Sequence, residues 1–360
     1  MAAMKTSRRN FLKTSIVTGA AASAAFRYPA AAFASESEKK DESTACACKG
    51  KVSLTAGEDH PDIIFKGLKN FESQIEKHSD GRRIVVKPNN VAIDNQLCAT
   101  HADSIEGILE FFKSIGRTDV IVAESAASGP TFEGFDNYGY FKLKAKFPEV
   151  KYIDLDKEEY EMVYVVSDED FHPRAVRMSK MLLDPASYVV SAAVMKTHDR
   201  VVATLSLKNI VFGAPIKDEG FRWGPGGKAG AKNDKPVAHG GGFRGVNYNL
   251  FANAFRLAPD LAVIDGYRGM EGNGPVGGTP VEHRIAVVSP DWLAADRVGI
   301  ELMGIDFANV GYLNYATNAN LGEGHLDKIE VIGEMIADHA KKYKLHQAVE
   351  RQMLWKQPMG

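Results

Sequence analysis

The chain has 360 residues, of which 44% are hydrophobic, so it is long and apolar enough to bury one large core or two small ones. The first 34 residues carry five basic and no acidic side chains, and the rest of the chain carries 39 Lys and Arg against 46 Asp and Glu. The resulting formal charge of −7 argues against nucleic acids and anionic membranes as partners.

Residues 1–34 have the pattern of a twin-arginine signal peptide. The sequence SRRNFLK at residues 7–13 precedes an apolar run of small residues at 16–25, and Ala32 and Ala34 offer a small-x-small cleavage site. We therefore expect export to the periplasm by the twin-arginine translocation machinery, a route that carries folded proteins. The apolar run is too short to span a bilayer, and no later stretch is long enough, so no membrane span is expected after cleavage.

Residues 35–51 form a polar leader that we expect to be disordered, and they contain two of the three cysteines. Cys46 and Cys48 are too close in sequence for an ordinary unstrained disulfide, and three cysteines, with Cys98, cannot all pair within the chain. Structural zinc sites and iron–sulfur clusters use about four ligands, so we do not expect a cysteine-ligated iron–sulfur cluster. The sequence leaves the role of Cys46 and Cys48 open.

From residue 52 onward, short apolar runs alternate with helical patterns of hydrophobic residues. The runs predict strands at residues 52–55, 83–87, 120–123, 151–155, 188–194, 261–264, 284–289 and 328–332. Helical patterns cover residues 61–77, 103–115, 247–257 and 291–303, and a polar helix follows up to residue 353. This alternation implies right-handed crossovers and a mainly parallel, doubly wound α/β sheet with helices on both faces. We expect one such domain at residues 52–334, then a C-terminal helix and tail at 335–360.

Residues 221–245 interrupt this alternation with eight glycines, several basic side chains and no periodicity. Long loops in compact domains are usually functional or disordered, so we predict a mobile loop that acts as a lid over a ligand. Before this loop, residues 205–212 are apolar enough for a buried helix start. They include Lys208, and a buried lysine needs a partner. Asp296, on the inward side of the 291–303 helix, needs a partner for the same reason.

Polar side chains follow four of the predicted strands, at the points where the strands end. Because ligands of an open parallel sheet bind outside the carboxyl ends of its strands, we expect these side chains to share one site. The alternative is four unrelated turns, since Asn and Asp often satisfy local backbone groups. The side chains concerned are Lys87, Asn89, Glu124, Ser125, Lys196, His198 and Asp265, with Glu271 in the glycine-rich segment 269–278.

The residue types suggest a division of roles at this site. Lysines would neutralise an anion, asparagines would orient it, and histidines with carboxylates would bind a metal ion or transfer protons. The catalytic candidates are Lys87, Lys196 and His198. The candidate metal ligands are His101, His198, His239 and Asp265. The candidate ligand-binding residues are Asn89, Lys208, Asn209, Glu124, Ser125, Asp265 and Glu271.

Each histidine also has an ordinary interpretation. His198 could be a hydrogen-bonded loop residue, His101 a helix-entry residue, and His239 an exposed residue before three glycines. The chain contains no GxxxxGK[ST] phosphate loop, no GxGxxG after its first strand, no GxSxG elbow and no HExxH pair. Motifs therefore give no support for a nucleotide-binding fold.

A series of short motifs resembles the family called domain of unknown function 362. The motifs are KPN at 87–89, CxTH at 98–101, ES at 124–125, KTH at 196–198, LKN at 207–209, DG at 265–266 and MEGxGP at 270–275, followed by the segment 291–296. They occur in the family's order over roughly residues 52–334. The resemblance implies a single α/β domain with a polar centre. Some relatives add a ferredoxin-like segment with clustered cysteines, which this chain lacks, so iron–sulfur electron transfer is not implied.

Together these observations predict an exported α/β protein with a Lys/His/carboxylate site for a small anionic ligand or a metal ion, which could be an enzyme. The alternative is a non-catalytic periplasmic binding protein, or a carrier or chaperone for a periplasmic redox enzyme. A nickel-dependent isomerase-like activity is a third interpretation, by analogy with other Lys/His-rich sites. The sequence does not define the cofactor, the substrate, the metal or the oligomeric state.

Overall fold

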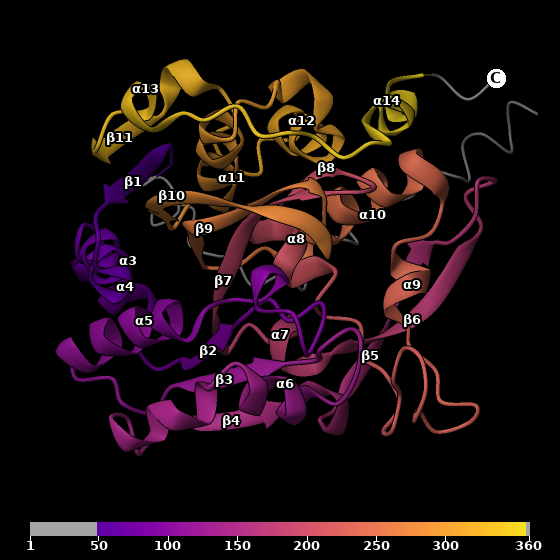
Figure 1. Ribbon diagram of the computed structural model, residues 1–360, viewed down its shortest axis with the longest axis horizontal. Helices are drawn as coiled ribbons and strands as arrows, with labels where there is room; N and C mark the ends of the chain where they lie inside the picture. Colours follow the sequence, from indigo (N-terminus) through magenta and orange to yellow (C-terminus); the bar gives the residue numbers. More distant parts are fainter. Residues whose placement is uncertain (1–48, 358–360) are drawn as a thin grey trace, which may run out of the picture. The chain divides into compact units, whose positions relative to one another are not determined.

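A computed structural model describes residues 49–357. The predicted signal peptide, most of the 35–51 leader, Cys46 and Cys48 lie outside the described residues. A nine-stranded sheet forms the centre, in the order β11-β1-β10-β9-β7-β2-β3-β4 with β8 paired to β7 (Figure 1). Its strands are β1 (Lys51–Ala56), β2 (Arg83–Lys87), β3 (Ile121–Glu124), β4 (Lys151–Asp154), β7 (Ser187–His198), β8 (Val202–Thr204), β9 (Leu261–Asn273), β10 (Gly277–Ser289) and β11 (Glu330–Gly333).

Most neighbouring strands of the sheet run parallel. The exceptions are β10, which is antiparallel to β1 and β9, and β8, which is antiparallel to β7. Helices cover both faces (Figure 1). The prediction of a mainly parallel α/β sheet is therefore confirmed. One face carries α3 (His60–Lys69), α4 (Glu72–Ser79), α5 (Ala102–Ser114) and α6 (Thr131–Asn137), and the other carries α8 (Ser206–Val211), α10 (Gly242–Leu257), α11 (Trp292–Leu302) and α12 (Gly311–Asn318).

The alternation of side chains along each strand divides them between two cores. On β9, Leu261 and Val263 pack on the side of α3 and α5, whereas Ala262 and Ile264 pack on the side of α8 and α11. Because helices cover both faces, such a strand reads as a continuous apolar run. Asp265 lies on the same face of β9 as Leu261 and Val263, so its carboxylate lies at the edge of the core that α3 and α5 cover.

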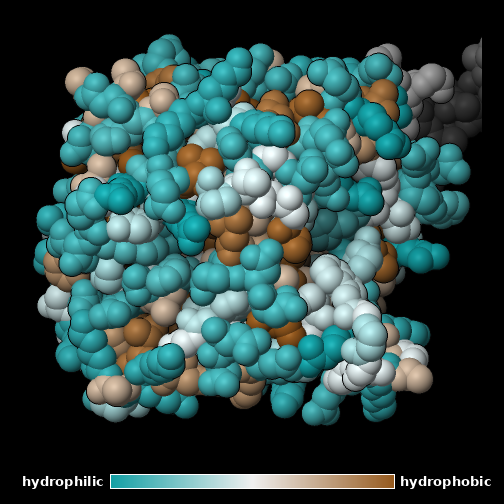
Figure 2. All heavy atoms as spheres, viewed as in Figure 1, coloured by the Kyte–Doolittle hydropathy of each residue, from teal (hydrophilic) through white to brown (hydrophobic). Residues whose placement is uncertain are grey.

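Short elements complete the described part of the chain. They are η2 (Gln96–Cys98), η3 (Tyr140–Ala145), η4 (Leu155–Lys157), α7 (Lys180–Leu183), α9 (Lys235–Ala238), η5 (Phe307–Asn309), η6 (Leu326–Lys328), α13 (Ile336–His339), α14 (Val349–Gln352) and η7 (Met353–Lys356). The face shown in Figure 2 is mostly hydrophilic, with hydrophobic residues in small groups. Within residues 49–357, every helix is too short or too polar to cross a membrane.

Several boundaries differ from the sequence predictions. The strands expected at 188–194 and 261–264 continue to His198 and Asn273, because β8 pairs with the end of β7 and β10 pairs with the end of β9. The glycine-rich segment 269–278 is consequently a hairpin rather than a loop, with Gly272 in the left-handed region at φ 78°. Lys196 and His198 thus lie inside a strand rather than after it.

Three further expectations differ in detail. The helix expected at 61–77 is two helices, α3 and α4, and the 221–245 segment contains α9 and the start of α10. The long polar helix expected up to residue 353 is replaced by the short α13 and α14. Between them the backbone bonds to other elements: Lys341 and Tyr343 donate to the end of α11, and Lys344 O accepts from Gly272 N. A hairpin of β5 (Tyr160–Val166) and β6 (Pro173–Ser179) was not predicted.

Candidate functional site

A cavity of about 310 Å³ lies at the carboxyl edge of the sheet, where β2, β3 and β7 end. Basic groups outnumber acidic ones in its polar lining, which has Lys87, Arg200, Lys208 and Lys235 with His198 and His239, against the two carboxylates Glu124 and Asp199. Apolar side chains complete the lining, among them Val91, Phe212, Trp223, Pro236 and Pro275. We call this cavity the basic pocket.

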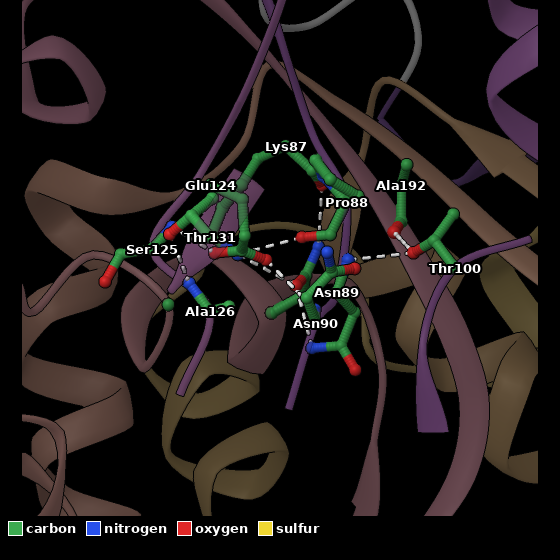
Figure 3. A network of polar contacts seen from close by, with 12 residues as sticks. Lys87, Pro88, Asn89, Asn90, Thr100, Glu124, Ser125, Ala126, Thr131 and Ala192 are labelled. Atoms are coloured by element: carbon green, nitrogen blue, oxygen red, sulfur yellow. Dashed lines mark hydrogen bonds and ion pairs between the residues drawn. The ribbon is translucent and has the colours of Figure 1, made fainter. Parts of the chain in front are cut away.

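Lys87 and Glu124 form a buried ion pair at the ends of β2 and β3 (Figure 3). Lys87 Nζ lies 2.8 Å from Glu124 Oε1 and also donates to Pro88 O at 2.9 Å and Asn209 Oδ1 at 3.2 Å. Glu124 Oε2 accepts a further bond from the Asn90 N–H at 3.0 Å. Burial lowers the pKa of Lys87, and the Glu124 carboxylate opposes that shift. All three donors of Lys87 are therefore in use, and its charge is balanced by the protein.

Lys208 differs from the other buried lysines of the described chain. It lies on α8 and lines the pocket with 6% of its surface exposed. Within residues 49–357 its Nζ makes no hydrogen bond or ion pair, and its nearest described interaction is the Phe212 ring, 5.4 Å away at the centroid. Burial lowers the pKa of Lys208 to about 7, and the positive charges of Lys196 and Lys87 act in the same direction.

Lys235 brings a second amine of shifted pKa into the same pocket. It lies on α9 and donates hydrogen bonds to Pro215 O and, at 2.8 Å, to Gly213 O. Burial lowers the pKa of Lys235 to about 7. Arg200, two residues after the end of β7, adds a guanidinium to the lining. A bound anion would favour the protonated form of both lysines.

His198 and His239 contribute two neutral imidazoles, with ring centroids 6.2 Å apart. His198 Nδ1 lies 3.1 Å from Asp199 Oδ1 and also accepts a hydrogen bond from Arg200 N at 3.1 Å. Because Nδ1 accepts this bond, Nε2 carries the proton of the neutral ring. His239 Nδ1 lies 2.7 Å from Lys235 O and must donate to it, which leaves Nε2 as an acceptor. Burial lowers the pKa of His198 well below its usual value and that of His239 to about 3. The pair therefore offers one donor and one acceptor.

Lys196 lies behind the residues that line the pocket and hydrogen-bonds to one of them. The structure places Lys196 outside the lining, with its Nζ donating to Asn89 Oδ1 and, at 2.8 Å, to Cys98 O. Asn89 Nδ2 donates to Asn209 Oδ1 at 3.0 Å, and Asn209 Nδ2 returns a bond to Lys87 O at 3.0 Å. Burial lowers the pKa of Lys196 to about 8. This chain of bonds fixes β7, α8 and the end of β2 relative to one another.

Comparison with known proteins now identifies the family. The family described as domain of unknown function (DUF362) matches residues 84–301. The chain belongs to the DUF362 family. It is also 25% identical over 232 residues to the thylakoid-associated protein sll1697 of Synechocystis sp., a match that covers 64% of this chain and 65% of that relative. The family expectation from the motifs is thereby confirmed.

The twin-arginine expectation is confirmed in the same way. A twin-arginine translocation pathway signal matches residues 5–25 of this DUF362 protein. The protein is therefore exported by the twin-arginine route, and a periplasmic location is consistent with that signal. The basic pocket lies within the family match, since its lining runs from Lys87 to Pro275.

The structure brings together part of the predicted site and separates the rest. Lys87, Asn89, Glu124, Ser125, His198, Lys208 and His239 line the basic pocket, and Lys196 and Asn209 lie directly behind them. Asp265 instead lies 3.0 Å from His60 Nε2. Glu271 Oε2 accepts a bond from Lys344 N at 2.8 Å, so it holds the C-terminal segment. His101 is the N-cap residue of α5 and accepts from Asp103 N.

The sequence analysis did not identify Arg200, Trp223 and Lys235 as lining residues of the basic pocket. Lys235 was one of several basic residues in the 221–245 segment, and no local signal set it apart from its exposed neighbours. Arg200 lies two residues after the KTH motif, but a charged residue in a turn is ordinary. His60 was also missed, although it precedes a helix-starting proline just as His101 precedes α5.

Asp296 shows how the protein positions α8. Its Oδ1 accepts a bond from Ser206 N at 2.8 Å and another from the Ser206 hydroxyl, and its Oδ2 accepts from Leu207 N at 3.2 Å. Burial raises the pKa of Asp296 to about 7. The expected partner for this buried carboxylate is therefore present, and it anchors the helix start that carries Lys208 and Asn209.

A separate group of side chains could hold a metal ion. Among the described residues, His60, His101 and Asp103 each offer a ligand atom, and these atoms lie within 4.8 Å of one another. The group contains no cysteine, and Cys98 is buried as a free thiol that donates to Asn95 O. None of its three members lines the basic pocket.

Proposed function

We propose that this exported DUF362 protein binds a small organic anion in the basic pocket. The observation that carries the proposal is Lys208, a buried side chain that lines the cavity and whose amine makes no hydrogen bond or ion pair among the described residues. A buried lysine without a partner is costly, and a ligand anion would supply the partner that the protein does not. Arg200 and Lys235 line the same cavity and would add to the positive potential around the ligand.

The lining also supports a class of ligand. A cavity of about 310 Å³ lies near the lower end of small-molecule sites, which span about 300–1,000 Å³. Phe212, Trp223 and Pro275 give it apolar surface in addition to its cationic groups. A small carboxylic acid or phosphate ester with an apolar portion would satisfy both parts of the lining.

The same lining favours an anion over a metal ion in this pocket. Lys208, Lys235 and Arg200 would repel a cation. Of the two carboxylates in the lining, Glu124 is paired with Lys87, and Asp199 lies 3.1 Å from His198 Nδ1. His198 and His239 would then act as a hydrogen-bond donor and acceptor for the ligand rather than as metal ligands.

Calorimetry with a panel of small carboxylates and phosphate esters, with inorganic phosphate included, tests the proposal. We expect one site per chain, and we expect Lys208→Met to weaken binding about 10-fold to 100-fold, because a charge-assisted hydrogen bond contributes about 1.5–3 kcal/mol. Lys77→Met, at an exposed lysine on α4, is the matched control and should bind like the unchanged protein. Equal affinity of the Lys208→Met and Lys77→Met proteins would refute the proposal.

Acid–base catalysis is a second candidate function. Lys208, with a pKa of about 7, and the neutral acceptor Nε2 of His239 lie at the same cavity, and groups that titrate near neutral pH are effective proton carriers. Exchange of carbon-bound protons of the bound anion with D₂O, followed by NMR, would reveal this activity. Exchange that is lost in His239→Gln at saturating anion would support an enzyme. Tight binding without exchange would favour a non-catalytic binding protein or a carrier for a periplasmic redox enzyme.

A further inference from the structure

We propose that His60, His101 and Asp103 form a binding site for a divalent transition metal, with Zn²⁺ as the best fit, and that Asp265 orients His60. The site lies between the starts of α3 and α5, away from the residues that line the basic pocket. It therefore goes beyond the anion-binding function and does not depend on it.

The distances already approach those of a metal centre. Asp103 Oδ2 lies 3.7 Å from His60 Nδ1 and 3.3 Å from His101 Nδ1. His101 Nδ1 accepts a hydrogen bond from Asp103 N at 3.2 Å, and this bond would be exchanged for the ion. Zinc binds imidazole nitrogen and carboxylate oxygen at about 2.0–2.2 Å in a tetrahedron, which places neighbouring ligand atoms about 3.3–3.5 Å apart. All three ligand atoms lie within 4.8 Å of one another, so side-chain rotations that bring them closer by up to about 1.5 Å would place them around one ion.

His60 is held as a metal-binding histidine usually is. It is 7% exposed, and its ring stacks on Tyr267 with centroids 4.3 Å apart and planes 9° apart. Its Nε2 lies 3.0 Å from Asp265 Oδ1, and this oxygen accepts a hydrogen bond from Tyr267 N at 2.9 Å. A carboxylate behind one ring nitrogen fixes the proton there and leaves the other nitrogen free for a metal. Asp265 would thus keep Nδ1 of His60 unprotonated toward Asp103.

The buried Nε2 of His60 provides a second, independent indication of a ligand. Although Asp265 is near, this nitrogen has no partner that meets hydrogen-bond geometry. A buried ring nitrogen without a hydrogen-bond partner is unfavourable, so the protein alone does not satisfy the hydrogen-bonding capacity of His60. A metal ion on Nδ1 would turn the ring toward a geometry in which Nε2–H points at Asp265.

The charges of the surroundings also favour a divalent cation. Two carboxylates, Asp103 and Asp265, contact two imidazoles, so an ion of charge +2 would bring the group to neutrality when both rings are neutral. The starts of α3 and α5 add partial positive charge, which the two carboxylates offset. Nitrogen and oxygen donors together suit Zn²⁺ and other divalent transition metals better than Ca²⁺ or Mg²⁺.

The site is open on one side. The side chains of His101 and Asp103 are 45% and 43% exposed, whereas His60 is buried beneath them. Three protein ligands with an accessible fourth position are the arrangement in which zinc keeps a water molecule or an exchangeable ligand. The proposed ion would therefore link α3 to α5 and remain accessible from solvent.

Metal titration of the full-length exported protein tests this site. Cys46 and Cys48 are also metal-binding side chains, so the titrations use a Cys46→Ser, Cys48→Ser background. After removal of metal with a chelator, Zn²⁺ is titrated against a chromophoric competitor, and Co²⁺ is added as a spectroscopic probe. We expect one ion per chain, a Co²⁺ spectrum of nitrogen and oxygen ligands, and a higher melting temperature with Zn²⁺.

Variants assign the ion to these side chains. His101→Ala and Asp103→Asn, at half-exposed positions, should weaken Zn²⁺ binding at least 100-fold while the protein stays folded. Asp265→Asn should weaken it about 10-fold to 100-fold, as expected for a residue that orients a ligand. His172→Ala is the matched control, because His172 lies 3.6 Å from Asp168 in an exposed His/Asp pair. The proposal is wrong if the protein binds no stoichiometric Zn²⁺, or if His101→Ala and Asp103→Asn bind Zn²⁺ as tightly as His172→Ala.

Discussion

Two buried charged residues, Lys208 and Asp296, differ in whether the protein supplies a partner for the charge. Each lies in an apolar stretch where an unpaired charge is costly, so a partner was expected for both. Asp296 has one, since Ser206 and Leu207 donate three hydrogen bonds to its carboxylate. Lys208 has no such partner among the described residues. At the scale of single residues, this contrast is the reason for assigning an anion to the pocket rather than to any other part of the sheet edge.

The lowered pKa of Lys208 predicts a pH dependence of stability in the ligand-free protein. Between pH 7 and about 10.5 the unfolded chain keeps the proton on this lysine and the folded chain has lost it. The unfolded state then binds more protons, so the free energy of unfolding rises with pH in this range, by up to about 1.4 kcal/mol per pH unit for one lysine. Denaturant unfolding at several pH values should show that the free energy of unfolding rises more steeply with pH in the unchanged protein than in Lys208→Met.

The sign of the effect can be checked at low pH. Below pH 7 both states carry the proton, and the folded state must bury an ammonium, so Lys208→Met should gain most in relative stability there. The advantage of the variant should shrink as the pH approaches 10. A stability difference between the two proteins that does not change from pH 6 to pH 10 would contradict the pKa of about 7.

At the scale of elements, the order and type of most strands and helices could be predicted, but their ends could not. The apolar runs of β2, β3 and β7 are long enough to identify buried strands. The continuation of β7 to His198 and of β9 to Asn273 depends on pairing with β8 and β10, which is a long-range contact that local patterns do not report. For the same reason, Asp265 was expected with Lys87 but lies beside His60, because Asp265 is on β9 and β7 separates that strand from β2 in the sheet.

The start of α8 should depend on Asp296. Asp296→Ala removes the acceptor of two backbone N–H groups and one hydroxyl in a buried place, which we expect to cost about 3 kcal/mol or more of unfolding free energy. Asp296→Asn keeps an acceptor oxygen and should lose clearly less. Urea unfolding measures both, and Asp119→Ala, at an exposed carboxylate, is the control. A loss for Asp296→Ala no larger than that of the control would show that this network does not stabilise α8.

The 221–245 segment should act as a lid whose base is fixed. Arg177 forms ion pairs with Asp218, which precedes the segment, and with Asp234 within it, at 2.6 and 3.0 Å. Trp223, half-exposed, lines the basic pocket from within it. We expect trypsin to cut first at Lys228 or Lys232 in the free protein and at least tenfold more slowly when an anion is bound. Equal cleavage rates with and without the anion would exclude a lid.

At the scale of the whole molecule, the export signal and the fold agree, because the twin-arginine route carries folded proteins. The twin-arginine signal at residues 5–25 directs the chain to a route for folded proteins, and the DUF362 match at residues 84–301 covers the residues that line the basic pocket. The alternation of apolar runs with helical patterns, the order of the motifs and the N-terminal signal pattern were sufficient to predict the α/β class, the family and the route. They were not sufficient to separate the basic pocket from the His60 group, because both lie at the carboxyl edge and use the same residue types.

Export should require the paired arginines. Replacement of both, Arg8→Lys and Arg9→Lys, keeps the positive charge but removes the guanidinium pair that the signal uses. We expect the precursor to stay in the cytoplasm, as measured by cell fractionation and the size of the protein. A conservative change elsewhere in the signal, Lys5→Arg, is the control. Normal amounts of mature periplasmic protein from the doubly substituted chain would contradict the assignment.

Proton uptake on anion binding tests the central claim most directly. At pH 8 Lys208 and Lys235 are mostly neutral in the free pocket, and an anion beside them should restore their protons. Calorimetry in buffers of different ionisation enthalpy should show uptake of more than one proton per bound anion, and affinity should fall as the pH rises above 7. Lys208→Met should take up about one proton fewer. Anion binding without proton uptake at pH 8, or with the same uptake in Lys208→Met, would contradict the account.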